Sequence, residues 1–124
     1  GPFNNKLAFN PVVNNTSGSV VGYKYFDFSK ISKEAKVELQ MNMETFGVEG
    51  TITIMLGSPF ESKGGRVVGT LNLDKKASGK PQIYSTTVSG LTEKPGKQSL
   101  FFRFNSKTPE KSLCDVYDFQ FVVK

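Results

Sequence analysis

Val37-Glu38-Leu39-Gln40-Met41-Asn42-Met43 is the stretch that decides the fold, because its apolar and polar side chains alternate without exception. Successive side chains of a β-strand point to opposite faces, so this period of two gives one strand an apolar face and a polar face. The polar face carries Glu38, Gln40 and Asn42, whose carboxylate and amide groups can bond to hydroxyls. An ordinary solvated sheet face has the same composition, so this face is open to either interpretation.

The same β-strand pattern recurs along the chain, in residues 19–28, 51–56, 67–73, 100–104 and 116–123. Turn-forming residues separate these stretches, as in Gly57-Ser58-Pro59 and Lys94-Pro95-Gly96. Six or more short strands at this spacing predict an all-β fold, an antiparallel β-sandwich of the jelly-roll type. A short helical turn is expected at most over residues 31–36.

The chain has 124 residues, the length of one ordinary domain, and no linker or repeat divides it. We therefore predict a single domain over residues 1–124, and a monomer. Gly1-Pro2 is typical of what a protease leaves after tag removal. This predicts a domain excised from a larger bacterial protein, secreted or at the cell surface, whose export signal lay elsewhere. The 11 Phe against no Trp indicate rings that mostly fill the core.

The net charge of +5 comes from lysines scattered over many turns, which is typical of a solvated surface. A nucleic-acid interface would concentrate these charges on one face, among exposed aromatic rings, so nucleic acid is not the expected partner. No apolar run is long enough to span a membrane. The single cysteine, Cys114, excludes an internal disulfide, and its place in a strand predicts a half-buried, unreactive thiol.

Histidine is absent, which excludes Ser-His-Asp and Cys-His catalysis and the usual zinc-hydrolase sites. A pair of carboxylates ~5–10 Å apart is what remains for a hydrolase. Asp115 and Asp118 both lie near the last strand, but they are three positions apart, so they are expected to project to opposite faces. The sequence therefore predicts that this is not an enzyme.

Three segments follow one another in an order that is similar to a known family: Gly18–Phe28 with Phe26-Asp27-Phe28 at its end, Gly50–Pro59 followed by Gly65–Leu71, and Gly96–Phe104 followed by Asp118–Phe121. Together they resemble a family 6 carbohydrate-binding module, over roughly residues 12–123. The first segment is similar to modules attached to family 43 glycoside hydrolases, which attack arabinoxylan and related hemicelluloses.

This resemblance implies a jelly-roll sandwich in which loops at one edge form a glycan cleft without catalysis. It implies a module that targets a covalently linked glycoside hydrolase to plant cell-wall polysaccharide, xylan or arabinoxylan first and β-glucan second. The Tyr and Trp that sandwich a sugar in the family fall near Asn14 and at Lys80 or Pro81, so neither ring is present. Asp115 takes the place of the Asn that bonds sugar hydroxyls.

A structural calcium ion is often part of the family, and the resemblance therefore implies one. Its acidic ligands belong to an N-terminal segment, but residues 1–10 contain no Asp or Glu. Asp118 is then the candidate that remains for a calcium ligand. We expect calcium to matter less here than in the family at large.

A glycan site needs exposed aromatic platforms and planar polar partners, because sugars present apolar C–H faces and hydroxyl edges. Tyr23 and Tyr25, two residues apart, are expected on one strand face as platforms. The other candidates are Tyr84 and Tyr117 as rings and, in or beside predicted loops, Asn14, Asn15, Gln82 and Asp115. Each ring could instead lie in the core with its hydroxyl bonded at the rim. The alternative function is a structural or protein-interaction domain with a degenerate glycan cleft.

Overall fold

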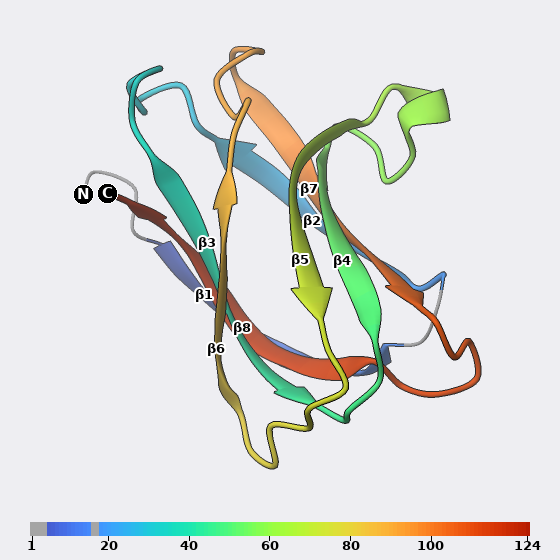
Figure 1. Ribbon diagram of the computed structural model, residues 1–124. Coiled ribbons are helices and arrows are strands. Elements are labelled where there is room, and N and C mark those ends of the chain that lie inside the picture. The colour runs from blue at the N-terminus through green and yellow to red at the C-terminus, as the bar shows by residue number, and fades with distance from the viewer. Residues whose placement is uncertain (1–4, 16–17) are drawn as a thin grey trace.

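The computed structural model describes residues 5–15 as backbone and residues 18–124 in full. The described residues form eight strands and one short 3-10 helix (Figure 1). In chain order these are β1 (Asn5–Asn15), β2 (Val20–Asp27), β3 (Val37–Thr45), β4 (Gly50–Leu56), η1 (Glu61–Lys63), β5 (Arg66–Leu73), β6 (Gln82–Val88), β7 (Lys97–Ser106) and β8 (Cys114–Val123).

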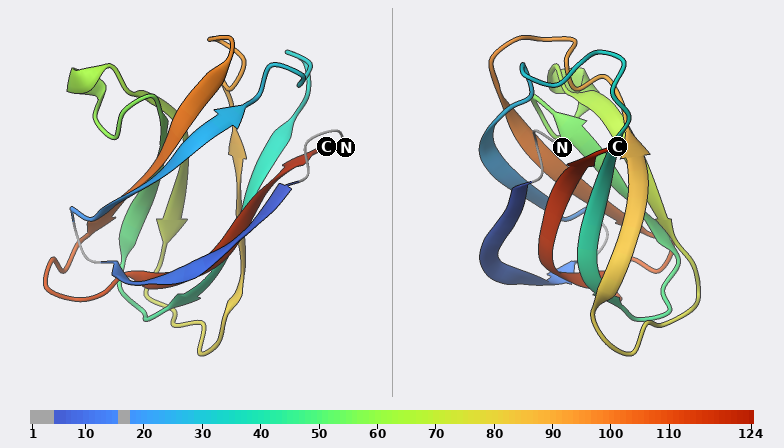
Figure 2. Two further views of the ribbon diagram at one scale, coloured as in Figure 1. Left: turned by 180° about the vertical axis from the view of Figure 1, so that it is seen from behind. Right: turned by 90° about the vertical axis from the view of Figure 1, so that its left-hand side faces the viewer.

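The strands form two antiparallel sheets of four strands each, which pack face to face (Figure 2). Sheet A has the order β1-β8-β3-β6, and sheet B has the order β2-β7-β4-β5. Apart from the β4–β5 hairpin, each connection passes from one sheet to the other. The predicted all-β jelly-roll sandwich is therefore confirmed.

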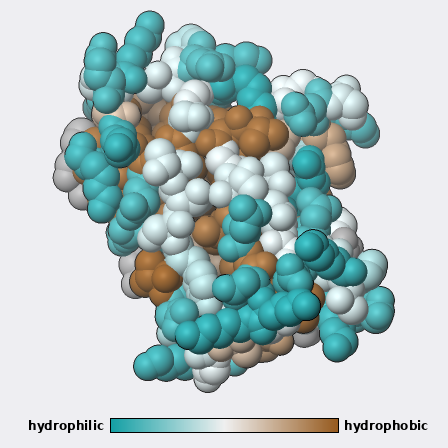
Figure 3. All heavy atoms as spheres, in the orientation of Figure 1, coloured by the Kyte–Doolittle hydropathy of each residue, from teal (hydrophilic) through white to brown (hydrophobic). Residues whose placement is uncertain are grey.

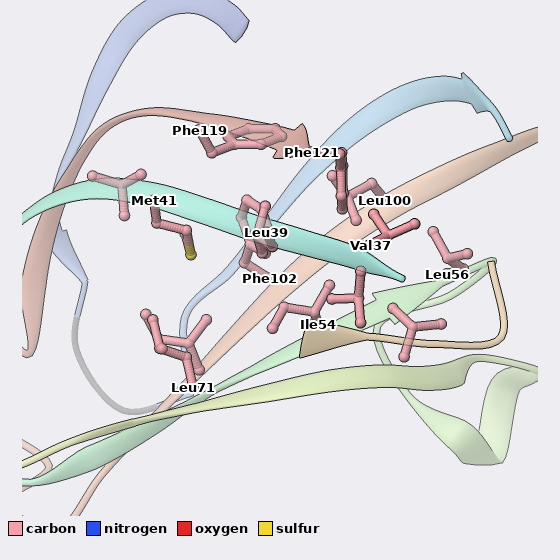
Figure 4. Close-up of a cluster of buried hydrophobic side chains, with 14 of the residues drawn as sticks. Val37, Leu39, Met41, Ile54, Leu56, Leu71, Leu100, Phe102, Phe119 and Phe121 are labelled. Carbon is pink, nitrogen blue, oxygen red and sulfur yellow. The ribbon is translucent and has the colours of Figure 1, made fainter. Parts of the chain in front are cut away.

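The alternation in residues 37–43 builds the core as expected. Val37, Leu39, Met41 and Met43 are buried, while the residues between them are half-exposed. Phenylalanine rings from both sheets meet these side chains (Figure 4). The ring centroids of Phe102 and Phe119, for example, lie 5.0 Å apart in an edge-to-face arrangement. The prediction that the rings mostly fill the core is confirmed for Phe26, Phe28, Phe102, Phe104, Phe119 and Phe121.

The sequence pattern did not predict two of the strands, and one expected helical turn did not form. β1 and β6 are edge strands of sheet A, and their sequences lack a clear period of two. Residues 31–36 make isolated turns instead of a helix, with the Ala35 N–H donating to the Ser32 carbonyl at 3.0 Å. The short 3-10 helix η1 lies in the β4–β5 connection, where a turn was expected.

A β-bulge in β2 overturns the expectation that Tyr23 and Tyr25 share one face. The pairing of β2 with β7 shifts register between Tyr23 and Phe26. Tyr25 takes a left-handed backbone conformation there, with a φ of 64°. The extra residue reverses the alternation, so that Phe26 is buried and Tyr25 is 60% exposed.

A second bulge, in β8, overturns the expectation that Asp115 and Asp118 project to opposite faces. Asn42 pairs with Asp118, but the next residue of β3, Met43, pairs with Val116. Tyr117 is therefore the extra residue, and it is half-buried. Asp115 and Asp118 consequently both lie on the outer face of sheet A.

Antiparallel pairing sorts the connections onto the two ends of the sandwich (Figure 1). The β2–β3, β4–β5 and β6–β7 connections lie at one end, at the top of Figure 1. The other end, at the bottom, gathers residues 18–19 with residues 46–49, 74–81 and 107–113. We call it the four-loop end. On the side of the molecule seen in Figure 3, hydrophilic residues gather at this end.

Candidate functional site

The outer face of sheet B changes from apolar to polar along its strands. The strand register arranges the residues of this face in three rows, each of which crosses the strands. The rows follow one another from the top of the sandwich to the four-loop end. The rows are Gly22–Phe101–Met55–Val67, then Val20–Arg103–Thr53–Thr70, and last Asn105–Thr51–Asn72.

The last row opens into a pocket of about 350 Å³ at the four-loop end. The Thr51 hydroxyl donates to Asn72 Oδ1 at 3.2 Å, which fixes the orientation of that amide. Among the described residues, no protein acceptor takes a hydrogen bond from the amide nitrogen of Asn72 or of Asn105, so both can donate to a ligand. The lining residues are Glu49, Gly50, Thr51, Asn72, Leu73, Asn105, Ser106 and Lys107.

Two lysines hold the one carboxylate that lines this pocket. Lys107 Nζ lies 3.3 Å from Glu49 Oε2, and Lys75 Nζ lies 3.6 Å from Glu49 Oε1. The hydrogen bond from Lys107, followed by the charges of Lys107 and Lys75, lowers the pKa of Glu49. Glu49 is therefore ionised at neutral pH, between two ammonium groups.

Arg103 holds the β4–β5 connection against the outer face of sheet B, at the end opposite the four-loop end. Arg103 Nη1 donates to the Pro59 carbonyl at 2.6 Å, and its guanidinium lies 5.5 Å from the centroid of the Phe60 ring. Met55 is fully buried beneath them, although it lies outside the core cluster. Phe60 remains 42% exposed as a ring at the edge of the face.

Phe101 supplies a second ring on the outer face of sheet B. A Cβ added at Gly22 would lie 2.8 Å from a carbon of the Phe101 ring, so this ring occupies the space that the glycine leaves open. Sequence reasoning missed Phe60, Phe101 and Arg103. The available signal was an aromatic ring and an arginine at the outward positions of residues 100–104, where polar residues are usual.

A second pocket at the four-loop end unites two of the predicted residues, Gln82 and Tyr84. It has a volume of about 380 Å³. Gln82 Nε2 donates to the Tyr84 hydroxyl at 3.1 Å, and this hydroxyl lies 3.0 Å from Thr45 Oγ1. The Tyr84 ring packs against the core, so it offers a bonded hydroxyl at the pocket and not a free ring. The lining residues are Asp74, Lys76, Ala77, Ser78, Gln82 and Tyr84.

The structure keeps Tyr23 and Tyr25 out of both pockets, against the expectation that they are paired platforms. The Tyr23 ring packs 5.0 Å from Phe119 and 5.8 Å from Phe102, and burial raises its pKa to about 12. It is therefore part of the core. Tyr25 is exposed on the edge strand of sheet B, toward the end opposite the four-loop end.

Asn14 and Asn15 were expected in or beside a loop, and they end β1 at the four-loop end, where Asn15 pairs with Cys114. Their side chains lie outside the described residues. Cys114 is fully buried, more than expected. Burial, followed by the charge of Asp115, raises its pKa to about 12.

Asp115 lies on the outer face of sheet A, opposite Glu44, and lines neither of the two pockets. The polar face that was predicted from residues 37–43 is confirmed here, and its side chains bond to one another. Gln120 Nε2 donates to Gln40 Oε1 at 3.0 Å, and Gln40 Nε2 donates to Glu38 Oε1 at 2.8 Å.

Asp118 is the candidate calcium ligand, and it lies opposite Asn42 on the outer face of sheet A. Asn42 Nδ2 donates to Asp118 Oδ2 at 3.2 Å in the middle of a sheet face. Calcium takes roughly six to eight oxygen ligands. In residues 18–124, no three His, Cys, Asp or Glu side chains gather as a metal site would require. The same residues contain no helix with the length and apolar character of a membrane span.

The sequence model of one family, carbohydrate binding module (family 6), matches residues 4–123. A comparison with curated proteins found no match. Among solved structures, the chain is similar to a glycoside hydrolase family 43 arabinoxylan arabinofuranohydrolase from Bacillus subtilis in complex with cellotetraose. The identity is 24% and the TM-score 0.69, over 90% of this chain and 21% of the enzyme, so the chain spans about a fifth of that protein.

Two further structures match nearly the whole of both chains. CsCBM6-3 from Clostridium stercorarium, in complex with cellobiose, has 19% identity and a TM-score of 0.66, over 100% of this chain and 85% of that chain. A β-1,3-glucan-binding CBM6 from Bacillus halodurans has 18% identity and a TM-score of 0.70, over 95% and 84%. At these identities the likeness establishes the fold.

Proposed function

The chain belongs to carbohydrate-binding module family 6, and on that premise we propose that it targets a larger glycoside hydrolase to plant cell-wall polysaccharide. Xylan or arabinoxylan is the first expected ligand, because the chain resembles a segment of an arabinoxylan arabinofuranohydrolase. β-Glucan is the second, because similar modules bind cellobiose and β-1,3-glucan. The parent protein is expected to be bacterial and secreted or at the cell surface.

The observation that carries this proposal is the outer face of sheet B. Asn72 and Asn105 offer amide donors to hydroxyl edges across a pocket of about 350 Å³. Farther along the same face, Phe60 and Phe101 offer rings to apolar C–H faces. Neighbouring strands lie ~4.8 Å apart, so the row from Asn72 to Asn105 spans ~10 Å, which suits an extended glycan. The loop pocket at Gln82 and Tyr84 is a second point of contact.

Binding without hydrolysis is the expected mode. Glu49 is the one carboxylate in the sheet B pocket, and two lysines neutralise it, whereas glycosidases pair two carboxylates across the scissile bond. Glu44 and Asp115 are cross-strand neighbours on sheet A, but neither lines a pocket described above. Incubation of the protein with arabinoxylan should release no reducing sugar. Release that disappears in Glu44→Gln would overturn this expectation.

Isothermal titration calorimetry with soluble arabinoxylan, xylan and β-1,3-glucan tests the proposal. Asn105→Ala removes an amide donor from the sheet B face and should weaken binding about fivefold, which corresponds to the ~1 kcal/mol of one hydrogen bond. Gln40→Ala is the matched control on the outer face of sheet A and should change nothing. Asp115→Ala reports on the residue that the family resemblance favours. If Asp115→Ala weakens binding and Asn105→Ala does not, the sheet B site is wrong.

A structural or protein-interaction role is the second candidate. Val20, Phe60 and Val67 are exposed apolar side chains on or beside the outer face of sheet B. Exposed apolar surface of this kind also suits a protein partner. Absence of binding to every polysaccharide in the panel would favour this second role.

A further inference from the structure

We propose that the polysaccharide carries uronic acid and that Lys107 and Lys75 bind its carboxylate at the rim of the sheet B pocket. This inference rests on the proposed function, because it names the class of glycan that the same pocket takes. Its basis is an imbalance of charge. One carboxylate, that of Glu49, faces two ammonium groups at 3.3 and 3.6 Å.

The two lysines have room for a second anion. Their side chains are 76% and 83% exposed, whereas the side chain of Glu49 is 32% exposed. An ammonium group has three donors. Within residues 18–124, Glu49 is the one ion-pair partner of each ammonium group. Lys107 and Lys75 can therefore keep their ion pairs with Glu49 and still donate hydrogen bonds toward solvent, where a ligand carboxylate would lie.

This two-to-one arrangement sets Glu49 apart from the other ion pairs of the described residues. Lys124 pairs with Glu38, one cation to one carboxylate. Arg66 pairs with Glu93 and also donates to Gln98 Oε1 at 2.7 Å, so both terminal nitrogens of its guanidinium group bind within the protein. Of these ion pairs, the one at the sheet B pocket therefore has an excess of positive charge.

The surrounding loops add to this excess. In residues 46–49, 74–81 and 107–113 there are five lysines and three carboxylates, a net charge of +2. One of these carboxylates, Asp74, accepts the backbone N–H of Lys76 at 2.9 Å and lines the other loop pocket. The cations are Lys75, Lys76, Lys80, Lys107 and Lys111, and the anions are Glu49, Asp74 and Glu110.

A carboxylate is the anion that this geometry favours. The Glu49 carboxylate already occupies the space between Lys107 and Lys75, which shows that both ammonium groups can serve the two oxygens of such a group. The amides of Asn72 and Asn105 line the same pocket and would bond the hydroxyls of the sugar that carries it. A uronic acid combines these two features in one sugar unit.

The test compares glucuronoxylan with the same polymer after chemical reduction of its carboxyl groups, by isothermal titration calorimetry. The unmodified protein should bind the acidic polymer three- to fivefold more tightly than the reduced one, as expected of roughly one exposed ion pair. Lys107→Gln should abolish this preference. Lys63→Gln, an exposed lysine on η1 at the opposite end, is the matched control and should keep the preference.

Glu49→Gln gives a result of opposite sign, which a purely structural role would not produce. Without the competing carboxylate, both ammonium groups are available, so the preference for glucuronoxylan over the reduced polymer should increase several-fold. Added NaCl should diminish the preference, because it screens exposed charges.

Three outcomes would overturn the inference. Equal affinity for the two polymers would refute uronate recognition and leave the proposed function standing. Binding to neither polymer would refute uronate recognition and xylan as the first expected ligand, and β-1,3-glucan would then test the proposed function. Tighter binding to a sulfated polysaccharide that survives Lys107→Gln would indicate unspecific attraction by the net charge. Melting temperatures of the variants show whether each protein is folded.

Discussion

Tyr23 and Tyr25 lie two residues apart on β2, yet the Tyr23 ring packs into the core and Tyr25 is 60% exposed. The bulge that separates them holds Tyr25 at a φ of 64°, which is unfavourable for a residue with a bulky side chain. The two rings therefore make opposite contributions to stability.

Tyr25→Gly should stabilise the protein. Glycine adopts positive φ without steric cost, and relief of the left-handed strain, ~1–2 kcal/mol, exceeds the entropic cost of glycine, ~0.5–1 kcal/mol. The expected gain is up to about 1.5 kcal/mol in the free energy of unfolding, measured by urea denaturation. Lys24→Gly is the control next to it, and it should destabilise because Lys24 has no positive φ. A loss of stability in Tyr25→Gly would mean that the ring contributes contacts that outweigh the strain.

Tyr23→Ala should cost about 3 kcal/mol, since it removes an aromatic ring from between Phe102 and Phe119. Its affinity for polysaccharide, per folded molecule, should match that of the unmodified protein, because Tyr23 faces the core. Urea denaturation and calorimetry measure the two effects separately. A variant with unchanged stability and weaker binding would restore Tyr23 as a sugar platform.

Alkaline pH should destabilise the fold through Cys114 and Tyr23. Burial raises the pKa of Cys114 from 9.0 and that of Tyr23 from 10.0, each to about 12. The unfolded chain loses these protons at a lower pH than the folded chain does. The contribution of the two groups to the free energy of unfolding is therefore fully present below pH 9 and is lost as the pH rises toward 12. In Cys114→Ala only Tyr23 remains, so the fall should begin about one pH unit later. Urea midpoints between pH 8 and pH 11 measure this, and superimposable pH profiles of the two proteins would contradict it.

Removal of calcium should have little effect. In residues 18–124 no three His, Cys, Asp or Glu side chains gather as a metal site would require, and the sequence offers no acidic residue before Asp27. Melting temperatures with and without a chelator should differ by a few degrees at most, which corresponds to ~1 kcal/mol or less. A drop of tens of degrees would point to ligands elsewhere in the chain.

The sequence by itself determined the class of fold and much of the core. The strict alternation from Val37 to Met43 specifies one buried and one polar face, since the backbone geometry of a strand turns a period of two into two sides. The phenylalanine rings carry no polar group, so most of them were expected in the space between the two sheets. The absence of histidine likewise excluded Ser-His-Asp and Cys-His catalysis without any knowledge of the structure.

Only the tertiary structure decided which side chains meet at the candidate site. One extra residue in β2 separates Tyr23 from Tyr25, and one in β8 brings Asp115 and Asp118 onto a common face, because a bulge reverses an alternation that the sequence pattern treats as unbroken. Glu49, Lys75 and Lys107 come from three different connections. Their contact depends on the pairing of strands far apart in the chain, and no local pattern of residues encodes that.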